Sequence, residues 1–308
     1  MSTLTTGLSF ALGETIDMLR DSVQTFAAEQ IAPRADAIDR DNQFPPELWK
    51  QLGELGLHGM TVSEDYGGTQ LGYLAHIVAL EEVSRASAAV GLSYGAHSNL
   101  CVNQLHRNGN AAQKAKYLPK LVSGEHVGAL AMSEPNAGSD VVSMKLRADL
   151  KGDRYVLNGA KMWITNGTVA DLAIVWAKLF DEAKGRESIA GFLVEKGTKG
   201  YTAPEQKRKH SLRASVTSEL VLQDVFVPEG NRLPEGNGLK APLGCLTQAR
   251  YGIAWGALGA AEDCFHRARQ YVLDRQQFGR PLAANQLIQK KLADRSEEHT
   301  SELQSRQC

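Results

Sequence analysis

The feature that most constrains the fold is a change in the spacing of apolar residues, followed by a return to the first pattern. After Glu14 apolar side chains recur at the spacing of one face of an α-helix. Near Gly128 the pattern changes to segments of about six residues, rich in Val, Ile, Leu, Trp and Tyr, separated by turn residues. After Pro242 the helical spacing returns. This order predicts an α+β protein with a mainly β region between two helical regions.

We therefore expect three domains: an N-terminal helical domain (1–125), a middle β domain (126–235) and a partial C-terminal helical domain (236–294). The last segment, 295–308, is polar and lacks the helical period. It resembles the translation of a DNA-sequencing adapter, so we expect a non-native tail, and a genuine polar tail is the alternative.

Local signals predict where some elements begin and end. Asn110 is a helix N-cap residue, which predicts a helix over Ala111–Val122. Lys151-Gly152-Asp153 and Asn158-Gly159 are typical of hairpin turns. One long helix is expected over Tyr251–Leu273.

Composition excludes several classes of protein. The 308 residues carry 34 Lys and Arg against 35 Asp and Glu, so the net charge of −1 gives no basic field for nucleic acid. No apolar run approaches the ~18 residues of a membrane span. From the first residues, Met1 to Gly7, we expect no export or transit signal. The four cysteines lack metal-ligand spacing, so we expect no metal, and reduced thiols in a cytoplasm-like compartment.

Two segments of the β region carry groups suited to a ligand. In the run from Ala131 to Asp140, two serines offer hydroxyls and Gly138 lets backbone N–H groups face a phosphate. In Trp163-Ile164-Thr165 an indole can cover a flat ring, and a hydroxyl can bond a ring nitrogen. A loop turn and a core Trp are the alternatives. A third segment, from Arg275 to Gln286, offers a guanidinium for a phosphate or a helix C-cap, and local physics favours the cap.

These three segments, in this order, closely resemble the acyl-CoA dehydrogenase family over Leu8 to Asp294. The resemblance implies a helical domain, a β-barrel-like middle domain and a four-helix C-terminal domain. It implies FAD as cofactor, with the third segment reaching the FAD of a neighbouring subunit. The FAD residues it implies are Leu130, Ala131, Met132, Ser133, Gly138, Ser139, Trp163, Ile164, Thr165, Arg275, Phe278 and Gln286.

The family's activity is the α,β-dehydrogenation of an acyl-CoA to a 2-enoyl-CoA. The resemblance also implies electron-transfer flavoprotein as the electron acceptor and a homo-oligomer, a tetramer in the family. It implies a cytoplasmic location in a bacterium and the mitochondrial matrix in a eukaryote. An oxygen-using acyl-CoA oxidase is a further alternative, because site access rather than a motif sets the reactivity of a flavin with oxygen.

The resemblance differs along the chain. The stretch from Glu81 to Lys145 resembles the isovaleryl-CoA branch of the family, whereas the stretch from Gly191 to Asp294 resembles the glutaryl-CoA branch. A chimeric gene assembly or a paralogue with mixed features would explain this. Gly91 stands where glutaryl-type enzymes use an Arg to hold a carboxylate, so we expect an isovaleryl-like acyl pocket. The alternatives are a glutaryl-type enzyme and a catalytically dead flavoprotein fragment.

The resemblance places no catalytic base in this chain. Isovaleryl-type enzymes carry a Glu before an Arg, and the matching pair here is Ala249-Arg250, which lacks the carboxylate. The later Glu of glutaryl-type enzymes has no counterpart. We do not expect Glu262 or Asp263 to replace this base, since they lie more than three helical turns beyond Ala249. The substrate residues implied are Ser139, Gly91, Leu243, Ala249 and Arg250.

Other titratable or apolar side chains are interpreted as structural. His97 and His126 are each isolated histidines, which are more often structural than catalytic. Tyr94 is either a core aromatic or part of an acyl pocket. With a partial bundle, the apolar stripe of the long helix, Ile253, Leu258 and Phe265, is expected to lie partly exposed, and the chain to be a poor enzyme.

Overall fold

The computed structural model describes residues 11–181 and 185–305. The chain begins with a helical region in which π and 3₁₀ turns join the α-helices. The α-helices are α1 (Glu14–Phe26), α2 (Ala35–Asp41), α3 (Glu47–Glu54), α4 (Tyr73–Ala86), α5 (Ala88–Gly95), α6 (Gln104–Asn108) and α7 (Ala111–Val122). The other turns are η1 (Ala27–Ile31), η2 (Ala32–Arg34), η3 (Leu57–Gly59), η4 (Glu64–Tyr66) and η5 (Ala96–Asn103). Asn110 caps α7 in a capping box with Gln113, as its sequence predicts.

Eight strands within the described ranges form one sheet. They are β1 (Gly128–Ala131), β2 (Arg147–Lys151), β3 (Arg154–Thr165), β4 (Leu172–Asp181), β5 (Arg186–Glu195), β6 (Tyr201–Thr202), β7 (Thr217–Pro228) and β8 (Arg232–Asn237), with short turns η6 (Val141–Ser143) and η7 (Glu229–Asn231). The strand order is β6-β7-β3-β2-β4-β5-β8, and β1 pairs with β4 in parallel. The middle region is thus mainly β.

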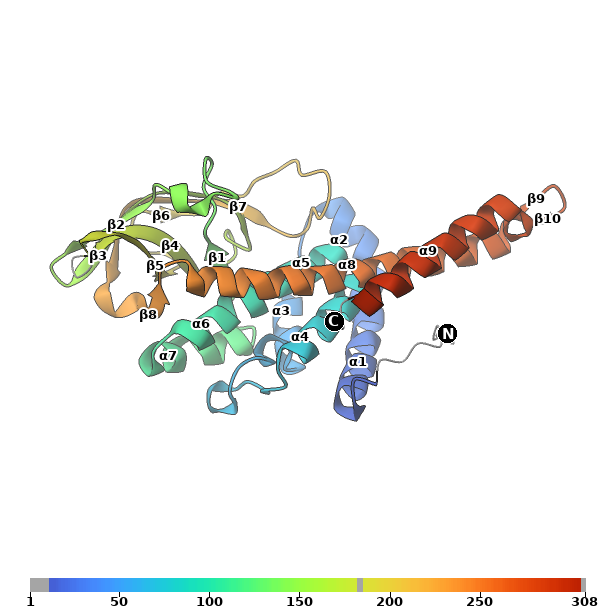
Figure 1. The fold of residues 1–308 in the computed structure, drawn as a ribbon, viewed down its shortest axis with the longest axis horizontal. Coiled ribbons are helices and arrows are strands. Elements are labelled where there is room, and N and C mark those ends of the chain that lie inside the picture. The colour runs from blue at the N-terminus through green and yellow to red at the C-terminus, as the bar shows by residue number, and fades with distance from the viewer. Residues whose placement is uncertain (1–10, 182–184, 306–308) are drawn as a thin grey trace.

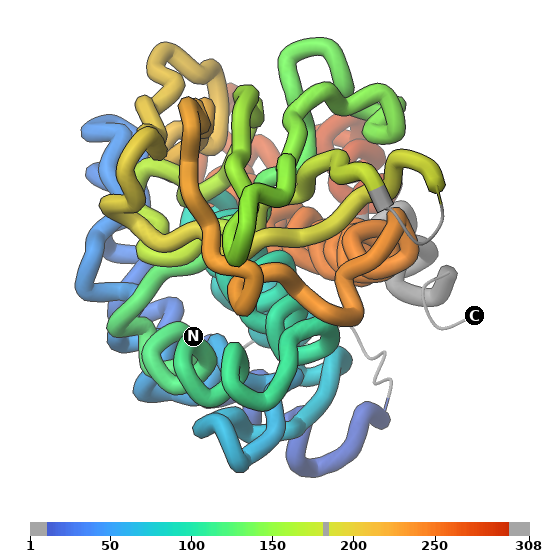
Figure 2. Tube along the Cα trace, turned by 90° about the vertical axis from the view of Figure 1, so that its left-hand side faces the viewer, coloured from blue at the N-terminus to red at the C-terminus, as the bar shows by residue number. Residues whose placement is uncertain are grey.

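Strand β4 shows why the sheet is buried on both faces. Its residues alternate between two cores: Ala173 and Val175 contribute to the core on one face, and Ile174 and Trp176 to the other. The second core also contains Leu118 of α7, so helices cover that face. A continuous apolar run is the pattern expected of a strand between two packed layers. Figure 2 shows the sheet and the N-terminal helices as two layers.

Helix α8 (Lys240–Asp274) runs under the sheet and along α4 (Figure 1). A short hairpin of β9 (Gln276–Gln277) and β10 (Arg280–Pro281) and a turn, η8 (Leu282–Ala284), then lead to α9 (Gln286–Ser305). Helix α9 folds back along α8, and the two project beyond the helical body (Figure 1). None of the described helices combines the length and the apolar content that a bilayer crossing requires.

Four local expectations differ from the structure. Asn158-Gly159 is not a hairpin turn: it lies inside β3, where the register shifts and Gly159 has a φ of +140°. The long helix begins at Lys240 rather than Tyr251, because Pro242 lies in its first turn, where proline is tolerated. Leu258 is buried rather than exposed. The helix also continues through residues 295–305, where polar residues predict an interruption.

Candidate functional site

The first predicted segment is a loop that leaves the inner strand β1. Leu130 and Met132 are buried, Ser133 is half-buried, and Gly138 and Ser139 are exposed. A Cβ atom at Gly138 would have no neighbour within 4 Å, so backbone here is open to a ligand. Because β1 lies inside the fold, the loop starts from a rigid position.

A buried ion pair holds this loop. The ammonium of Lys161 on β3 donates to Glu134 Oε1 at 2.9 Å and to the carbonyl of Met132 at 2.9 Å. The carboxylate of Glu134 also accepts from the backbone N–H groups of Lys145 at 2.6 Å and Leu146 at 3.0 Å. The Lys161 side chain is fully buried, and burial lowers its pKa to about 8.

The second segment lies beside the first. The amide of Met162 donates to the carbonyl of Ser133 at 2.8 Å, which joins β3 to the loop. The β3–β7 register shifts between Lys161 and Ile164, and Trp163 has a φ of +64°. The indole of Trp163 is consequently 66% exposed while Ile164 is buried. A flat apolar ring beside an open loop fits the isoalloxazine ring and phosphates of FAD.

The third segment lies elsewhere. Arg275 is the C-cap that follows α8, Phe278 is fully exposed in the β9–β10 turn with a φ of 53°, and Gln286 begins α9. Figure 1 shows this hairpin projecting away from the sheet. The structure therefore does not bring these residues to the loop and Trp163 of the same chain.

Of the predicted substrate residues, Ser139 lies in the loop after β1, and the others lie on α8 and α5. Leu243 and Arg250 are exposed and Ala249 is half-buried. Gly91 is buried, and a Cβ atom there would lie 2.0 Å from Oγ of Ser84 on α4. Close helix packing is thus one reason for this glycine, and its part in an acyl pocket stays a prediction.

The acidic residues beyond Ala249 are engaged elsewhere. Glu262 forms an ion pair with Arg85 of α4, and Asp263 pairs with Arg267 at 2.6 Å. Both carboxylates therefore hold cations of the helical scaffold, which agrees with their exclusion as bases.

His97 and Tyr94 are structural. His97 donates from Nε2 to the carbonyl of Leu121 and accepts at Nδ1 from the amide of Gly128, both at 2.9 Å. The hydroxyl of Tyr94 donates to the carbonyl of Leu57 at 3.0 Å inside the core. Neither ring reaches a surface where it could move a substrate proton.

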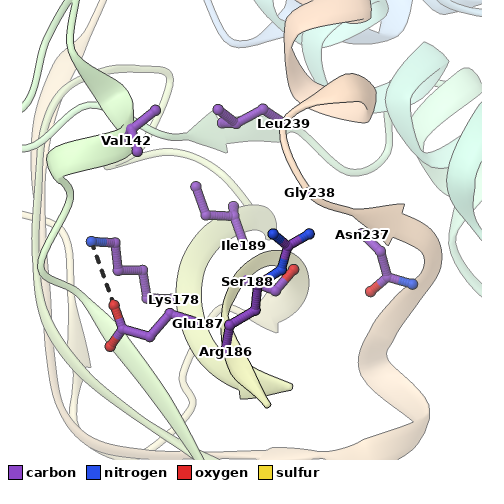
Figure 3. Close-up of a pocket in the computed structure, with 9 residues that line it drawn as sticks. All are labelled: Val142, Lys178, Arg186, Glu187, Ser188, Ile189, Asn237, Gly238 and Leu239. Atoms are coloured by element: carbon purple, nitrogen blue, oxygen red, sulfur yellow. Dashed lines mark ion pairs between the residues drawn. The ribbon is translucent and has the colours of Figure 1, made fainter. Parts of the chain in front are cut away.

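A cavity of about 380 Å³ lies between η6, β4 near its end, the beginning of β5, and the end of β8 with the connection to α8 (Figure 3). Lys178 and Arg186 bring positive charge to it, and Lys178 Nζ lies 3.8 Å from Glu187 Oε2. Sequence reasoning missed this cavity because no single segment builds it. Its lining is Val142, Lys178, Arg186, Glu187, Ser188, Ile189, Asn237, Gly238 and Leu239.

The fold and these loops fit a protein that binds a flat, phosphate-bearing cofactor. Sequence models described as "Acyl-CoA dehydrogenase" match the chain with their N-terminal domain at residues 13–125, their middle domain at 129–225 and their C-terminal domain at 236–300. The chain belongs to the acyl-CoA dehydrogenase family, FAD-dependent oxidoreductases that act on a CH–CH bond.

Two relatives and one solved structure illustrate the similarity. Mitochondrial isovaleryl-CoA dehydrogenase of Oryza sativa subsp. japonica is 52% identical over 93% of this chain and 70% of its own length. Mitochondrial 2-methylacyl-CoA dehydrogenase of Solanum tuberosum is 52% identical over the same shares. A glutaryl-CoA dehydrogenase from Mycobacterium smegmatis in complex with FADH2 superposes with a TM-score of 0.91 at 37% identity, covering 96% of this chain and 75% of that one.

Proposed function

We propose that this chain binds FAD between the loop Leu130–Ser139 and Trp163, and desaturates a short branched acyl-CoA of the isovaleryl type. The observation that carries the proposal is the bond from the Met162 amide to the Ser133 carbonyl, which joins the two flavin segments beside an exposed indole. FAD, when bound, supplies the two-electron acceptor for oxidation of the Cα–Cβ bond.

In this proposal the chain's own residues bind and orient the flavin and the acyl-CoA. The Trp163 ring covers one side of the flavin, and the hydroxyls of Ser133 and Thr165 bond its edge. Open backbone at Gly138 and Ser139 faces a phosphate. Arg250 and Leu243 line the part of the site that contacts CoA.

The cavity beside Lys178 and Arg186 takes the phosphate-bearing nucleotide end of CoA. A guanidinium and an ammonium recognise phosphate oxygens by charge-assisted hydrogen bonds. Half-buried Ser188 and exposed Asn237 add neutral polar groups to the same lining.

The acyl group that we propose is isovaleryl-like, with glutaryl as the alternative. Gly91 offers nothing to a distal carboxylate, and the curated relatives named above act on branched acyl groups according to their names. Ala249 offers no carboxylate for the α proton. Since a general base contributes ~10²–10⁴-fold, we propose slow turnover and retain the inactive flavoprotein as the second candidate.

A flavin spectrum of the purified chain, recorded before and after anaerobic addition of isovaleryl-CoA or glutaryl-CoA, tests the proposal. We expect bound flavin, a spectral change at lower concentrations of isovaleryl-CoA, and slow bleaching. Trp163→Ala should weaken FAD binding, whereas Phe226→Ala, which removes another exposed ring of the sheet, should not. A chain without flavin, or turnover at an ordinary ~1–10³ s⁻¹, would contradict it.

The proposed partners follow from the family. We propose electron-transfer flavoprotein as electron acceptor and a homo-oligomer in which Arg275, Phe278 and Gln286 reach the FAD of another copy. We propose the mitochondrial matrix in a eukaryote, since the plant relatives are named as mitochondrial, and the cytoplasm in a bacterium.

A further inference from the structure

The ion pair of Lys161 and Glu134, which holds the loop Leu130–Ser139, has an unusually full set of hydrogen-bond partners. The Lys161 ammonium has three partners: Met132 O and Glu134 Oε1, each at 2.9 Å, and Met144 Sδ at 3.8 Å. These partners match its three N–H donors. The side chain of Lys161 has no exposed surface, and that of Glu134 is 8% exposed. An interior charge pair of this kind is costly to form unless each group is fully bonded.

The pair connects both ends of the loop to the sheet. Through Glu134 it holds the amides of Lys145 and Leu146, which lie just before β2. Through Lys161 it holds the carbonyl of Met132, one residue before the Ser133 carbonyl that Met162 binds. The ammonium of Lys161 and the carboxylate of Glu134 therefore fix the loop that carries the proposed flavin contacts.

We propose that Lys161 and Glu134 are positioning residues for the flavin. Their pair fixes the Met132–Ala137 segment in the geometry that binds FAD, and it keeps the interior beneath that segment electrically neutral. Neither side chain is required to touch the flavin. The inference rests on the proposed function, since it assigns a task to the same loop.

Removal of the cation tests the geometry first. Lys161→Met leaves the Met132 carbonyl and Glu134 Oε1 without their ammonium donor. We expect FAD affinity to fall about tenfold, equivalent to ~1.4 kcal/mol, in a fluorescence titration of the full chain. The matched control is Lys196→Met, which removes an exposed ion pair with Asp171 at 3.6 Å, just outside strands β5 and β4 of the same sheet, and should leave FAD affinity unchanged.

The midpoint potential of the bound flavin tests whether Lys161 neutralises the negative charge of Glu134. In Lys161→Met the carboxylate of Glu134 loses its counter-charge, so it opposes the negative charge gained on reduction, and the potential should fall. The double variant Lys161→Met/Glu134→Gln removes both charges. Its potential should return to that of the unchanged chain while its FAD affinity stays weakened. A merely structural loosening would leave the double variant at least as perturbed as the single one.

The outcomes separate this inference from the proposed function. If the unchanged chain binds no FAD, the proposed function fails. If the unchanged chain binds FAD and Lys161→Met binds it equally well, or if the double variant does not restore the potential, the positioning role is overturned. Should Lys161→Met fail to fold, the affinity of the double variant decides: a tenfold loss supports the role, and an unchanged affinity overturns it.

Discussion

Three buried histidine side chains, those of His58, His76 and His97, lie in the helical region, and His97 contacts strand β1. The rings of His58 and His97 lie 4.4 Å apart between centroids, and His76 Nδ1 lies 3.1 Å from the hydroxyl of Tyr94. Burial lowers the pKa values of His58 and His76 to about 4, and lowers that of His97 well below its ordinary value. Since His97 accepts the Gly128 amide at the start of β1, the neutral form is part of the folded structure.

Burial raises the pKa of Glu81 to about 7, so that one carboxyl acts in the opposite direction, but three histidines outweigh it and the chain should lose stability in mild acid. In the unfolded chain histidines bind protons near pH 6.5, whereas the folded pKa values are depressed. Their contribution is complete above pH ~6.5 and is lost as the pH falls towards ~4. We expect the urea midpoint of unfolding to fall between pH 7 and pH 5. His58→Gln, which retains an N–H donor for the Trp49 carbonyl, should flatten this dependence. Equal midpoints at both pH values would contradict the prediction.

At the scale of elements, glycines let α8 approach α4. A Cβ atom at Gly259 would lie 2.0 Å from the backbone oxygen of Glu81, and one at Gly256 would lie 2.9 Å from Oγ of Ser84. The backbone oxygen at Gly259 cannot move away without shifting α4. This contact therefore fixes how closely the C-terminal helix packs onto the N-terminal region.

Two glycine substitutions on α8 should affect the stability of the chain differently. Gly259→Ala forces the helices apart and should destabilise the chain by ~1–3 kcal/mol. Gly244→Ala, where a Cβ atom meets nothing within 4 Å, should be neutral or stabilising by up to about 1 kcal/mol, because Ala is the better helix former. Chemical denaturation of both variants measures this. If Gly259→Ala were no less stable than Gly244→Ala, the close contact would not be a constraint.

Local signals in the sequence predicted elements well where chemistry is local. The Asn110 cap and the change from helical to β spacing each depend on neighbouring residues. The prediction of a hairpin turn at Asn158-Gly159 was wrong because the same residue types occur in β-bulges and in turns. Only the pairing of β3 with β7 distinguishes a bulge from a turn here.

The candidate site was only partly visible in the sequence for the same reason. The Trp163 and Ser133 segments were predicted from their residue types. The partnership of Lys161 with Glu134 spans 27 residues, and the cavity beside Arg186 combines several elements, so neither has a local pattern. Such contacts exist only once the sheet has formed.

At the scale of the whole molecule, the α8–α9 hairpin projects beyond the rest of the described chain and exposes several apolar side chains. Phe278 is fully exposed, Leu287 is 71% exposed and Tyr271 is 60% exposed. Figure 1 shows these helices extending away from both layers, so no other element of the described chain covers their ends. Apolar surface gathered on one projection favours association between copies.

We expect the purified chain to self-associate through this hairpin. Replacement of the apolar ring in Phe278→Ser removes the most exposed part of that surface, so association should weaken and the mean mass at a fixed concentration should fall. Sedimentation velocity over a range of protein concentrations measures this. Phe180→Ser is the matched control, because Phe180 is 56% exposed but belongs to β4, a strand of the sheet that lies away from the hairpin (Figure 1). If Phe180→Ser lowers the mass as much as Phe278→Ser, or if neither variant differs from the unchanged chain, the hairpin is not the surface through which copies associate.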